Sequence, residues 1–222
     1  MEFYEVMRTT FAAREYTGEA LPDAVLYDIL ENARFAPSGG NRQGNRVIVV
    51  RDAAARDRLA ALGEPAAKLY TAQVKAGESP FNTVVPSKVT AAEAEATAPH
   101  PMLVEPCRNA SVVLVFVVDL KVVASIDRDL DRVGVISGGS IFPFVWNVLM
   151  AARHEGYGGT ITTLAVAQEP EVRELLNIPE DFAVCAVVPL GKPVKQLTKL
   201  KRRPVEDIAV RETFDGAAFG QE

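Results

Sequence analysis

Ser-Val-Val-Leu-Val-Phe-Val-Val, residues 111–118, is the stretch of sequence that decides the fold. Its β-branched and aromatic residues are typical of a strand, and Asp119 ends the apolar run. Because the run is continuous rather than alternating, we expect both faces of this strand to be buried. The sequence therefore predicts a central strand in a sheet whose two faces are covered by helices.

Strand-like and helix-like segments alternate on both sides of this central stretch. Two further strands are predicted at 47–50 and 182–189. Helices are predicted at 2–9, 22–35, 53–62, 66–76, 141–153 and 170–176. No internal repeat or clear linker interrupts this order, which favours a single domain over residues 1–222.

Length, composition and charge exclude several classes of protein. The 222 residues are 48% hydrophobic and 24% charged, which is enough for a sizeable core. A net charge of −5 and a pI of about 5.3 offer no basic field for nucleic acid. The longest apolar run, 112–118, is too short to span a membrane. No signal peptide is evident and the two cysteines lack metal-ligand spacing, so we expect a cytoplasmic protein without a metal site.

Residues 77–106 differ from the rest of the chain because five prolines interrupt them. A helix of two turns is predicted at 91–97 within this segment. Long irregular segments in compact domains are often lids or binding loops, although a plain surface connection also fits the composition. We interpret the segment as a lid. Tyr70 and Phe81 are then rings that either stack on an aromatic ligand or pack in the core.

Residues 36–43, Ala-Pro-Ser-Gly-Gly-Asn-Arg-Gln, carry the clearest ligand-binding chemistry. Pro37 disfavours helical geometry at the residue before it, so the preceding helix should end there. Gly39 and Gly40 allow a positive φ and a close approach of a ligand to the backbone. The next residues add amide and guanidinium groups. Such a loop can hold a flat polar ring or an anion, and a simple turn is the alternative.

Several kinds of catalytic site are missing from the sequence. His100 lies between prolines and His154 lies near a helix C-terminus, so neither is placed for a hydrolase triad. The chain has no HExxH pair, no phosphate-binding GxxxxGK[ST] motif and no GxGxxG after a strand. If the protein is an enzyme, a cofactor should therefore carry the chemistry.

Three motifs in a fixed order resemble those of the FMN-dependent nitroreductase family, and the likeness extends over nearly the whole chain. Residues 10–16, Thr-Phe-Ala-Ala-Arg-Glu-Tyr, are similar to the family's RRSxRxF start. Residues 36–43 are close to APSxxNxQPW, with Gly44-Asn45 in place of the final Pro-Trp. Residues 156–163 and the later Lys-Arg-Arg-Pro at 201–204 complete the set.

The resemblance implies an α+β fold in which a mixed β-sheet is flanked by helices on both faces. It also implies an intertwined homodimer with two FMN sites at the subunit interface. A C-terminal tail, residues 205–222, would embrace the partner subunit, and a frayed terminus is the alternative. Bound FMN, with NADH or NADPH as the electron donor, is the cofactor set that the resemblance implies.

The resemblance also assigns residues to the parts of FMN. Arg202 matches the family's late arginine and is expected to hold the phosphate. Arg14 matches the second arginine of the first motif and is expected near N1 and O2 of the ring, where a cation stabilises the reduced flavin. Thr162 is expected near N5 as a tuning residue, with no catalytic side chain. The other cofactor contacts implied are Pro37, Ser38, Gly39, Asn41, Ile161, Thr163 and Thr10.

The first motif departs from the family pattern at three positions. Thr10, Phe11 and Ala12 stand where the family has Arg-Arg-Ser. One contact to the phosphate is therefore weakened. Arg8, one helical turn away, is a candidate to replace the missing arginine.

The function implied is that of an oxidoreductase that passes electrons from NAD(P)H through flavin N5 to a small acceptor, such as a nitroaromatic or a quinone. Reductive dehalogenation and flavin fragmentation are alternatives within the same family. The Glu-x3-Tyr arrangement of the deiodinase branch is not found near residues 64–75. A flavin-binding carrier or redox sensor without turnover, and a dimer without a ligand, are alternatives of other classes.

Overall fold

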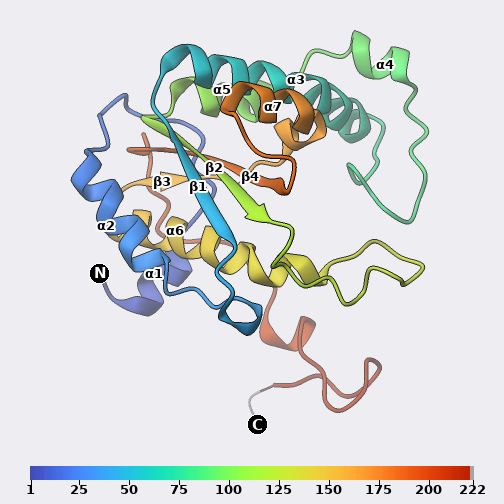
Figure 1. Cartoon of the computed structure of the whole chain (residues 1–222). Coiled ribbons are helices and arrows are strands. Elements are labelled where there is room, and N and C mark those ends of the chain that lie inside the picture. Colours follow the sequence, from blue (N-terminus) through green and yellow to red (C-terminus); the bar gives the residue numbers. More distant parts are fainter. Residues whose placement is uncertain (221–222) are drawn as a thin grey trace.

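A computed structural model describes residues 1–220 of the chain. The order of helices and strands is close to the predicted one (Figure 1). A helix at 101–109 and a strand at 158–159 are added, and the predicted helices 53–62 and 66–76 are joined into one. The helices are α1 (Phe3–Thr9), α2 (Asp23–Ala33), α3 (Ala53–Lys75), α4 (Ala91–Ala96), α5 (Pro101–Asn109), α6 (Phe142–His154) and α7 (Glu169–Leu176). The strands are β1 (Asn45–Val50), β2 (Val112–Asp119), β3 (Gly158–Gly159) and β4 (Phe182–Gly191), and 3-10 turns lie at η1 (Gly39–Asn41), η2 (Ile136–Ser140), η3 (Leu164–Gln168) and η4 (Val205–Asp207).

The four strands form one sheet in the order β1-β2-β4-β3, and neighbouring strands pair antiparallel. The predicted central strand is confirmed, because β2 lies between β1 and β4 and its seven apolar residues are all buried. At the β3 edge of the sheet, Ala12 and Gly159 form an isolated parallel β-bridge. The fold is therefore α+β, as expected.

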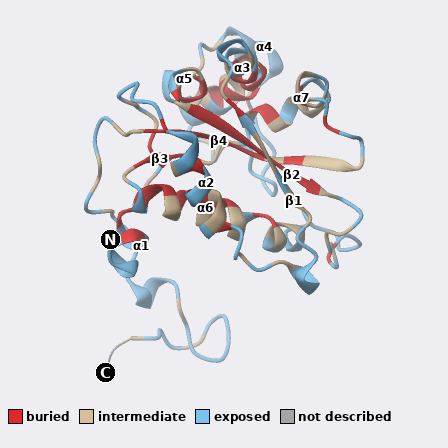
Figure 2. Ribbon diagram, turned by 60° about the vertical axis from the view of Figure 1, so that its left-hand side comes forward, coloured by how far each residue is buried: buried red, intermediate tan, exposed pale blue. Residues whose placement is uncertain are grey.

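Helices cover both faces of the sheet, so the layered arrangement predicted from residues 111–118 is confirmed (Figures 1 and 2). On one face, α2 and α6 pack through Ile29 and Val145 against Leu114 and its neighbours. On the other face, α3, α5 and α7 bury a second apolar cluster, whose members include Leu59, Val104, Val113 and Val172. Alternate residues of β2 thus supply both cores.

The predicted break between helices 53–62 and 66–76 is wrong. The chain continues as one helix of 23 residues, α3, with Pro65 inside it. Proline removes a backbone donor and usually breaks a helix. Here Gly63, Ala66 and Ala67 around it are buried, so tertiary packing overrides the local preference.

The segment predicted as an irregular lid also ends earlier than expected. Residues 101–109 form α5, which packs Val104 and Cys107 into the second core. Pro101 occupies the first turn, where proline is tolerated, and Nδ1 of His100 accepts a hydrogen bond from the Met102 amide at 3.2 Å. The irregular part is therefore 77–100, with α4 inside it.

After β4 the chain first runs along the N-terminal segment, where the amide of Val194 donates to the Glu15 carbonyl at 3.0 Å. The residues from 205 onward then lie apart from the body of the fold (Figure 1). Their apolar side chains Val205, Ile208 and Phe214 are exposed, and Phe214 is 100% exposed. The predicted tail, residues 205–222, continues for two residues beyond the described part of the chain.

Candidate functional site

A cavity of about 230 Å³ lies where the N-terminal segment meets α3, α5 and the chain after β3. Arg14 and residues 160–164 line one side of it, and Tyr70 of α3 lines another. The remaining lining residues come from α5 and are Met102, Leu103, Pro106 and Cys107. The cavity thus brings together Arg14 with Ile161, Thr162 and Thr163, which lie almost 150 residues further along the sequence.

Glycines let the N-terminal segment lie directly against the sheet. The amide of Ala13 donates to the carbonyl of Gly159 at 3.0 Å, and a Cβ on Gly158 would meet the Cβ of Ala13 at 3.1 Å. The Tyr16 hydroxyl lies 2.9 Å from the Ala13 carbonyl and 3.0 Å from that of Pro189. This packing fixes the backbone that carries Arg14.

Backbone hydrogen bonds hold Thr162 at the edge of β4. Its amide donates to the carbonyl of Val187 at 2.9 Å, and its carbonyl accepts from the amide of Val187 at 2.8 Å. The Thr162 hydroxyl accepts a long bond from the Leu164 amide at 3.4 Å. Thr162 thus lines the cavity from a fixed backbone, and within residues 1–220 its hydroxyl donates no hydrogen bond, which leaves its proton for a ligand.

Arg14 is the cation of this cavity. Its guanidinium donates to the Ala12 carbonyl at 3.3 Å, and within residues 1–220 no carboxylate lies within 4.0 Å of it. Burial raises the pKa of the Cys107 thiol to about 12 and the pKa of the Tyr16 hydroxyl far above its usual value. Both groups stay neutral at pH 7, so Arg14 gives the cavity a positive charge.

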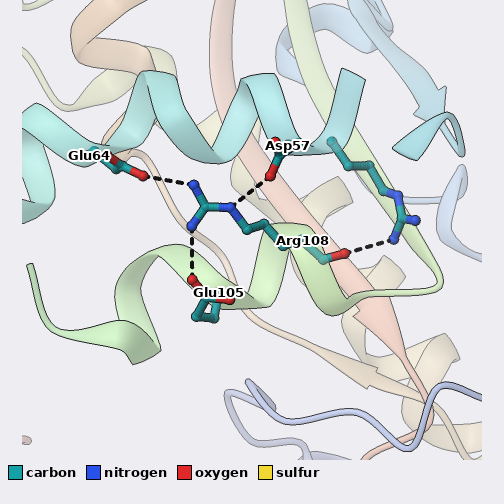
Figure 3. Close-up of polar contacts among 5 residues, drawn as sticks. Asp57, Glu64, Glu105 and Arg108 are labelled. Carbon is teal, nitrogen blue, oxygen red and sulfur yellow. Dashed lines mark hydrogen bonds and ion pairs between the residues drawn. The ribbon is translucent and has the colours of Figure 1, made fainter. Parts of the chain in front are cut away.

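An ion-pair network joins the two helices that wall the cavity (Figure 3). Arg108 of α5 reaches Asp57 at 2.8 Å and Glu64 at 2.7 Å, both on α3, and also Glu105 on its own helix at 2.8 Å. The carboxylates, led by Glu64, raise the pKa of Arg108 above its usual value. Glu64 is thereby engaged in holding α5 to α3.

The second predicted motif forms an exposed loop whose backbone is held in an unusual shape. Gly40, Asn41 and Gln43 have φ values of 62°, 52° and 50°, which non-glycine residues adopt only at a cost. The Ser38 hydroxyl accepts from the Gln43 amide, and the Ser140 hydroxyl accepts from the Gly39 amide, both at 3.0 Å. These bonds fix Ser38 and Gly39 while Pro37 and Asn41 remain exposed.

This loop lies far from the Arg14 cavity within one protomer. Thr162 bridges to Val187, which pairs through Val115 to Ile48 of β1. Three interstrand steps of about 4.8 Å put Thr162 roughly 14 Å from β1. Asn45, where the loop ends, lies three residues, or about 10 Å, further along the strand. The structure therefore brings the predicted site residues together as two separate groups.

The predicted cofactor contacts Thr10 and Arg202 do not line the Arg14 cavity, and neither does Arg8, the candidate for the missing arginine. Thr10 is buried, and its hydroxyl donates to the Val6 carbonyl at 2.7 Å, because a threonine at a helix end readily bonds back to the preceding turn. Arg8 lies over the ring of Tyr4, 5.9 Å from its centre. Arg202 is exposed and donates to the Lys201 carbonyl at 2.7 Å.

The residues of α5 that line the cavity were not predicted as site residues from the sequence. Two prolines were interpreted as breaks, although Met102–Pro106 and Leu103–Cys107 repeat at the i, i+4 spacing of a helix face. Tyr70 does line the cavity, whereas Phe81 packs on Tyr70 with ring centres 6.4 Å apart.

The described part of the chain has neither a cluster of metal ligands nor a helix that could span a membrane. Between residues 1 and 220, no group of three or more His, Cys, Asp or Glu side chains is placed to hold a metal ion. Over the same range, no helix has both the length and the apolarity needed to cross a bilayer.

Comparisons with known proteins agree with this architecture. The sequence profile of the Nitroreductase family matches residues 7–192. Iodotyrosine deiodinase from Nematostella vectensis is 26% identical over 212 residues, covering 94% of this chain and 74% of the relative. An NADH dehydrogenase from Thermus thermophilus is 29% identical over 201 residues, covering 89% of each.

A solved structure has the same fold. Oxidised iodotyrosine deiodinase bound to FMN and 3-iodo-L-tyrosine superposes with a TM-score of 0.69 and 20% identity, covering 96% of this chain and all of that one. The family match spans most of the chain, so the protein belongs to the Nitroreductase family, a family of flavoprotein oxidoreductases.

Proposed function

We propose that this protein is an FMN-dependent oxidoreductase that takes electrons from NADH or NADPH and passes them to a small organic acceptor, such as a nitroaromatic or a quinone. The observation that carries the proposal is the convergence of Arg14, Ile161, Thr162 and Thr163 on one cavity. The names of the relatives support it, since one is an NADH dehydrogenase and another was solved with FMN.

The residues present fit a flavin. A guanidinium without a carboxylate partner suits the ring edge at N1 and O2, where negative charge develops on reduction. The threonine hydroxyls offer a donor toward N5. When bound, FMN would supply the two-electron chemistry that the side chains lack. The chain's own part is to hold the ring, exclude water and keep a positive charge beside it.

The site is proposed to be completed by a second copy of the chain. A cavity of about 230 Å³ is smaller than the roughly 300–1,000 Å³ typical of ligand sites. In a homodimer, the loop with Pro37, Ser38, Gly39 and Asn41 of one protomer would close the Arg14 cavity of the other. Both groups of predicted residues would then contact one FMN.

Exposed apolar side chains support the same homodimer. Phe3, Tyr4 and Met7 of α1 and Trp146 of α6 are exposed, and monomeric proteins rarely leave such residues uncovered in groups. The tail from residue 205 onward adds Phe214. We propose one domain over residues 1–222, a lid at 77–100 and a tail that packs on the partner.

An absorption spectrum of the purified protein, recorded before and after anaerobic addition of each nicotinamide, tests this function. We expect the visible bands of bound flavin to bleach with NADH or NADPH and to return when a nitroaromatic or quinone is added. Tight flavin that neither nicotinamide reduces would indicate a binding protein. A colourless protein that ignores added FMN would refute the proposal.

Replacing Thr162 with alanine should slow reduction of the bound flavin roughly tenfold or more, because a donor aimed at developing charge would be lost. The dissociation constant for FMN should change little, since the backbone bonds to Val187 remain. Stopped-flow bleaching by NADH measures the rate, and fluorescence titration measures the affinity.

Thr17→Ala is the matched control, because Thr17 is exposed, its hydroxyl accepts a hydrogen bond from the Glu19 amide at 3.2 Å, and it does not line the cavity. It should reduce at the wild-type rate. Identical kinetics for the Thr162 variant would remove that hydroxyl from the reacting part of the flavin.

A further inference from the structure

Arg153, in the last turn of α6, is a buried arginine without a carboxylate partner. Arg153 is only 8% exposed, and its Nε donates a hydrogen bond to the Thr9 hydroxyl at 3.0 Å. Within residues 1–220, no carboxylate oxygen lies within 4.0 Å of it. By contrast, Arg51 and Arg173, which are more exposed, each pair with a carboxylate.

Burying an unpaired guanidinium is costly, because the ion loses water without gaining a counter-charge. The two terminal nitrogens of Arg153 make no hydrogen bond within the described chain. Neither nitrogen is a fully enclosed atom without a hydrogen-bond partner. Both therefore remain accessible to solvent. An anion that reaches this opening would find a nearly desolvated cation, where charge-assisted hydrogen bonds are strong.

A basic segment of the chain follows a residue that is anchored beside Arg153. Gln196, five residues after β4, donates from Nε2 to the carbonyl of Thr9 at 3.1 Å. The segment after β4 is thus anchored on the same residue that Arg153 touches. Lys199, Lys201 and Arg202 follow within six residues of Gln196. The basic residues thus follow closely, along the chain, a residue that is bonded to the end of α1 beside Arg153.

We propose that Arg153 binds the phosphate of FMN together with Lys199, Lys201 and Arg202, in place of the arginine that the first motif lacks at Thr10. The inference rests on the proposed function and names a residue for it. Arg8, the nearer candidate in the sequence, is exposed and lies over Tyr4, whereas Arg153 is held in place by Thr9.

Comparing FMN with riboflavin, which lacks the phosphate, tests the assignment. The apoprotein, with each variant in turn, is titrated with both flavins by fluorescence quenching. We expect Arg153→Gln to weaken FMN binding roughly 10- to 100-fold, as for loss of a charged hydrogen bond, and to leave riboflavin binding within about twofold of the wild type. Arg153→Lys, which keeps the charge, should retain part of the preference for FMN.

Arg58→Gln, on the exposed face of α3, is the matched control and should keep the wild-type preference. Equal weakening of both flavins in the Arg153 variants would overturn the inference, because it would indicate a structural role. Loss of the preference for FMN over riboflavin in Arg8→Gln, but not in the Arg153 variants, would overturn the inference too. So would Arg153 variants that form a weaker dimer but keep the wild-type preference. A wild-type protein that binds neither flavin would refute the proposed function itself, whatever the variants do.

Discussion

Replacing Gly159 with alanine should destabilise the protein by roughly 3 kcal/mol, at the upper end of the cost of overpacking a core. A Cβ at this position would lie 2.4 Å from the Pro189 carbonyl oxygen and 2.5 Å from a methyl group of Leu190. The backbone cannot move away easily, because Gly159 pairs with Leu190 and its carbonyl accepts from Ala13. The clash is with backbone as well as side chain, so no rotamer change relieves it.

Thermal unfolding at a fixed protein concentration measures this effect. For a chain of this size, roughly 3 kcal/mol corresponds to a fall in melting temperature of roughly 6–12 °C. Gly139→Ala is the control, since a Cβ there meets nothing within 4 Å, and it should melt near the wild-type temperature. Equal melting temperatures for the two variants would show that β3 and β4 are not packed as described.

Gly159 also lies between two parts of the site. One is Arg14 in the N-terminal segment, and the other is residues 160–164 after β3. Moving β3 away from β4 would shift Ala13 through its hydrogen bond and, with it, Arg14. Any Gly159→Ala protein that remains folded should therefore bind FMN more weakly than the Gly139→Ala control. Stability and site geometry are coupled here because one backbone contact serves both.

The parts of the fold that could be predicted from the sequence are those with a strong local signal. Residues 112–118 are an uninterrupted apolar run with five valines, and they form the buried central strand. The long apolar helix before His154 was predicted within one residue at each end. In both cases local propensity and tertiary burial favour the same structure, so pattern and packing agree.

Other elements could not be predicted, because tertiary contacts decide them. β3 is a strand of two glycines, and glycine has low strand propensity. It forms there because only glycine allows Ala13 and Leu190 to approach so closely. Pro65 and Pro106 lie inside helices for a similar reason, since buried neighbours hold those helices together.

The candidate site divides in the same way. The motifs identified Arg14 and Thr162, and the structure places both on one cavity. The motifs gave no indication that the loop at 37–41 lies on another part of the protomer, since order in the sequence carries no distances. Arg153 lies in no motif. Only its burial without a counter-charge in the described chain indicates it as a ligand-binding residue.

Replacing Arg202 with alanine should weaken FMN binding by roughly 1.5–3 kcal/mol, the usual effect of removing a hydrogen bond to a charged group. That is roughly a 10- to 150-fold rise in the dissociation constant. Arg202 is exposed, and its guanidinium donates only to the neighbouring Lys201 carbonyl in the described chain. Its removal should therefore leave the melting temperature of the apoprotein unchanged, so that a loss of affinity reports on the ligand contact.

Arg203→Ala provides the control, because Arg203 is adjacent, equally charged and also exposed. Loss of one positive charge lowers the long-range attraction for a phosphate to a similar extent in both variants. Only a direct contact distinguishes them, and it should appear as a larger effect in Arg202→Ala for FMN and no difference for riboflavin. If both variants weaken FMN equally, the segment acts through its net charge, and Arg202 has no individual role in holding the phosphate.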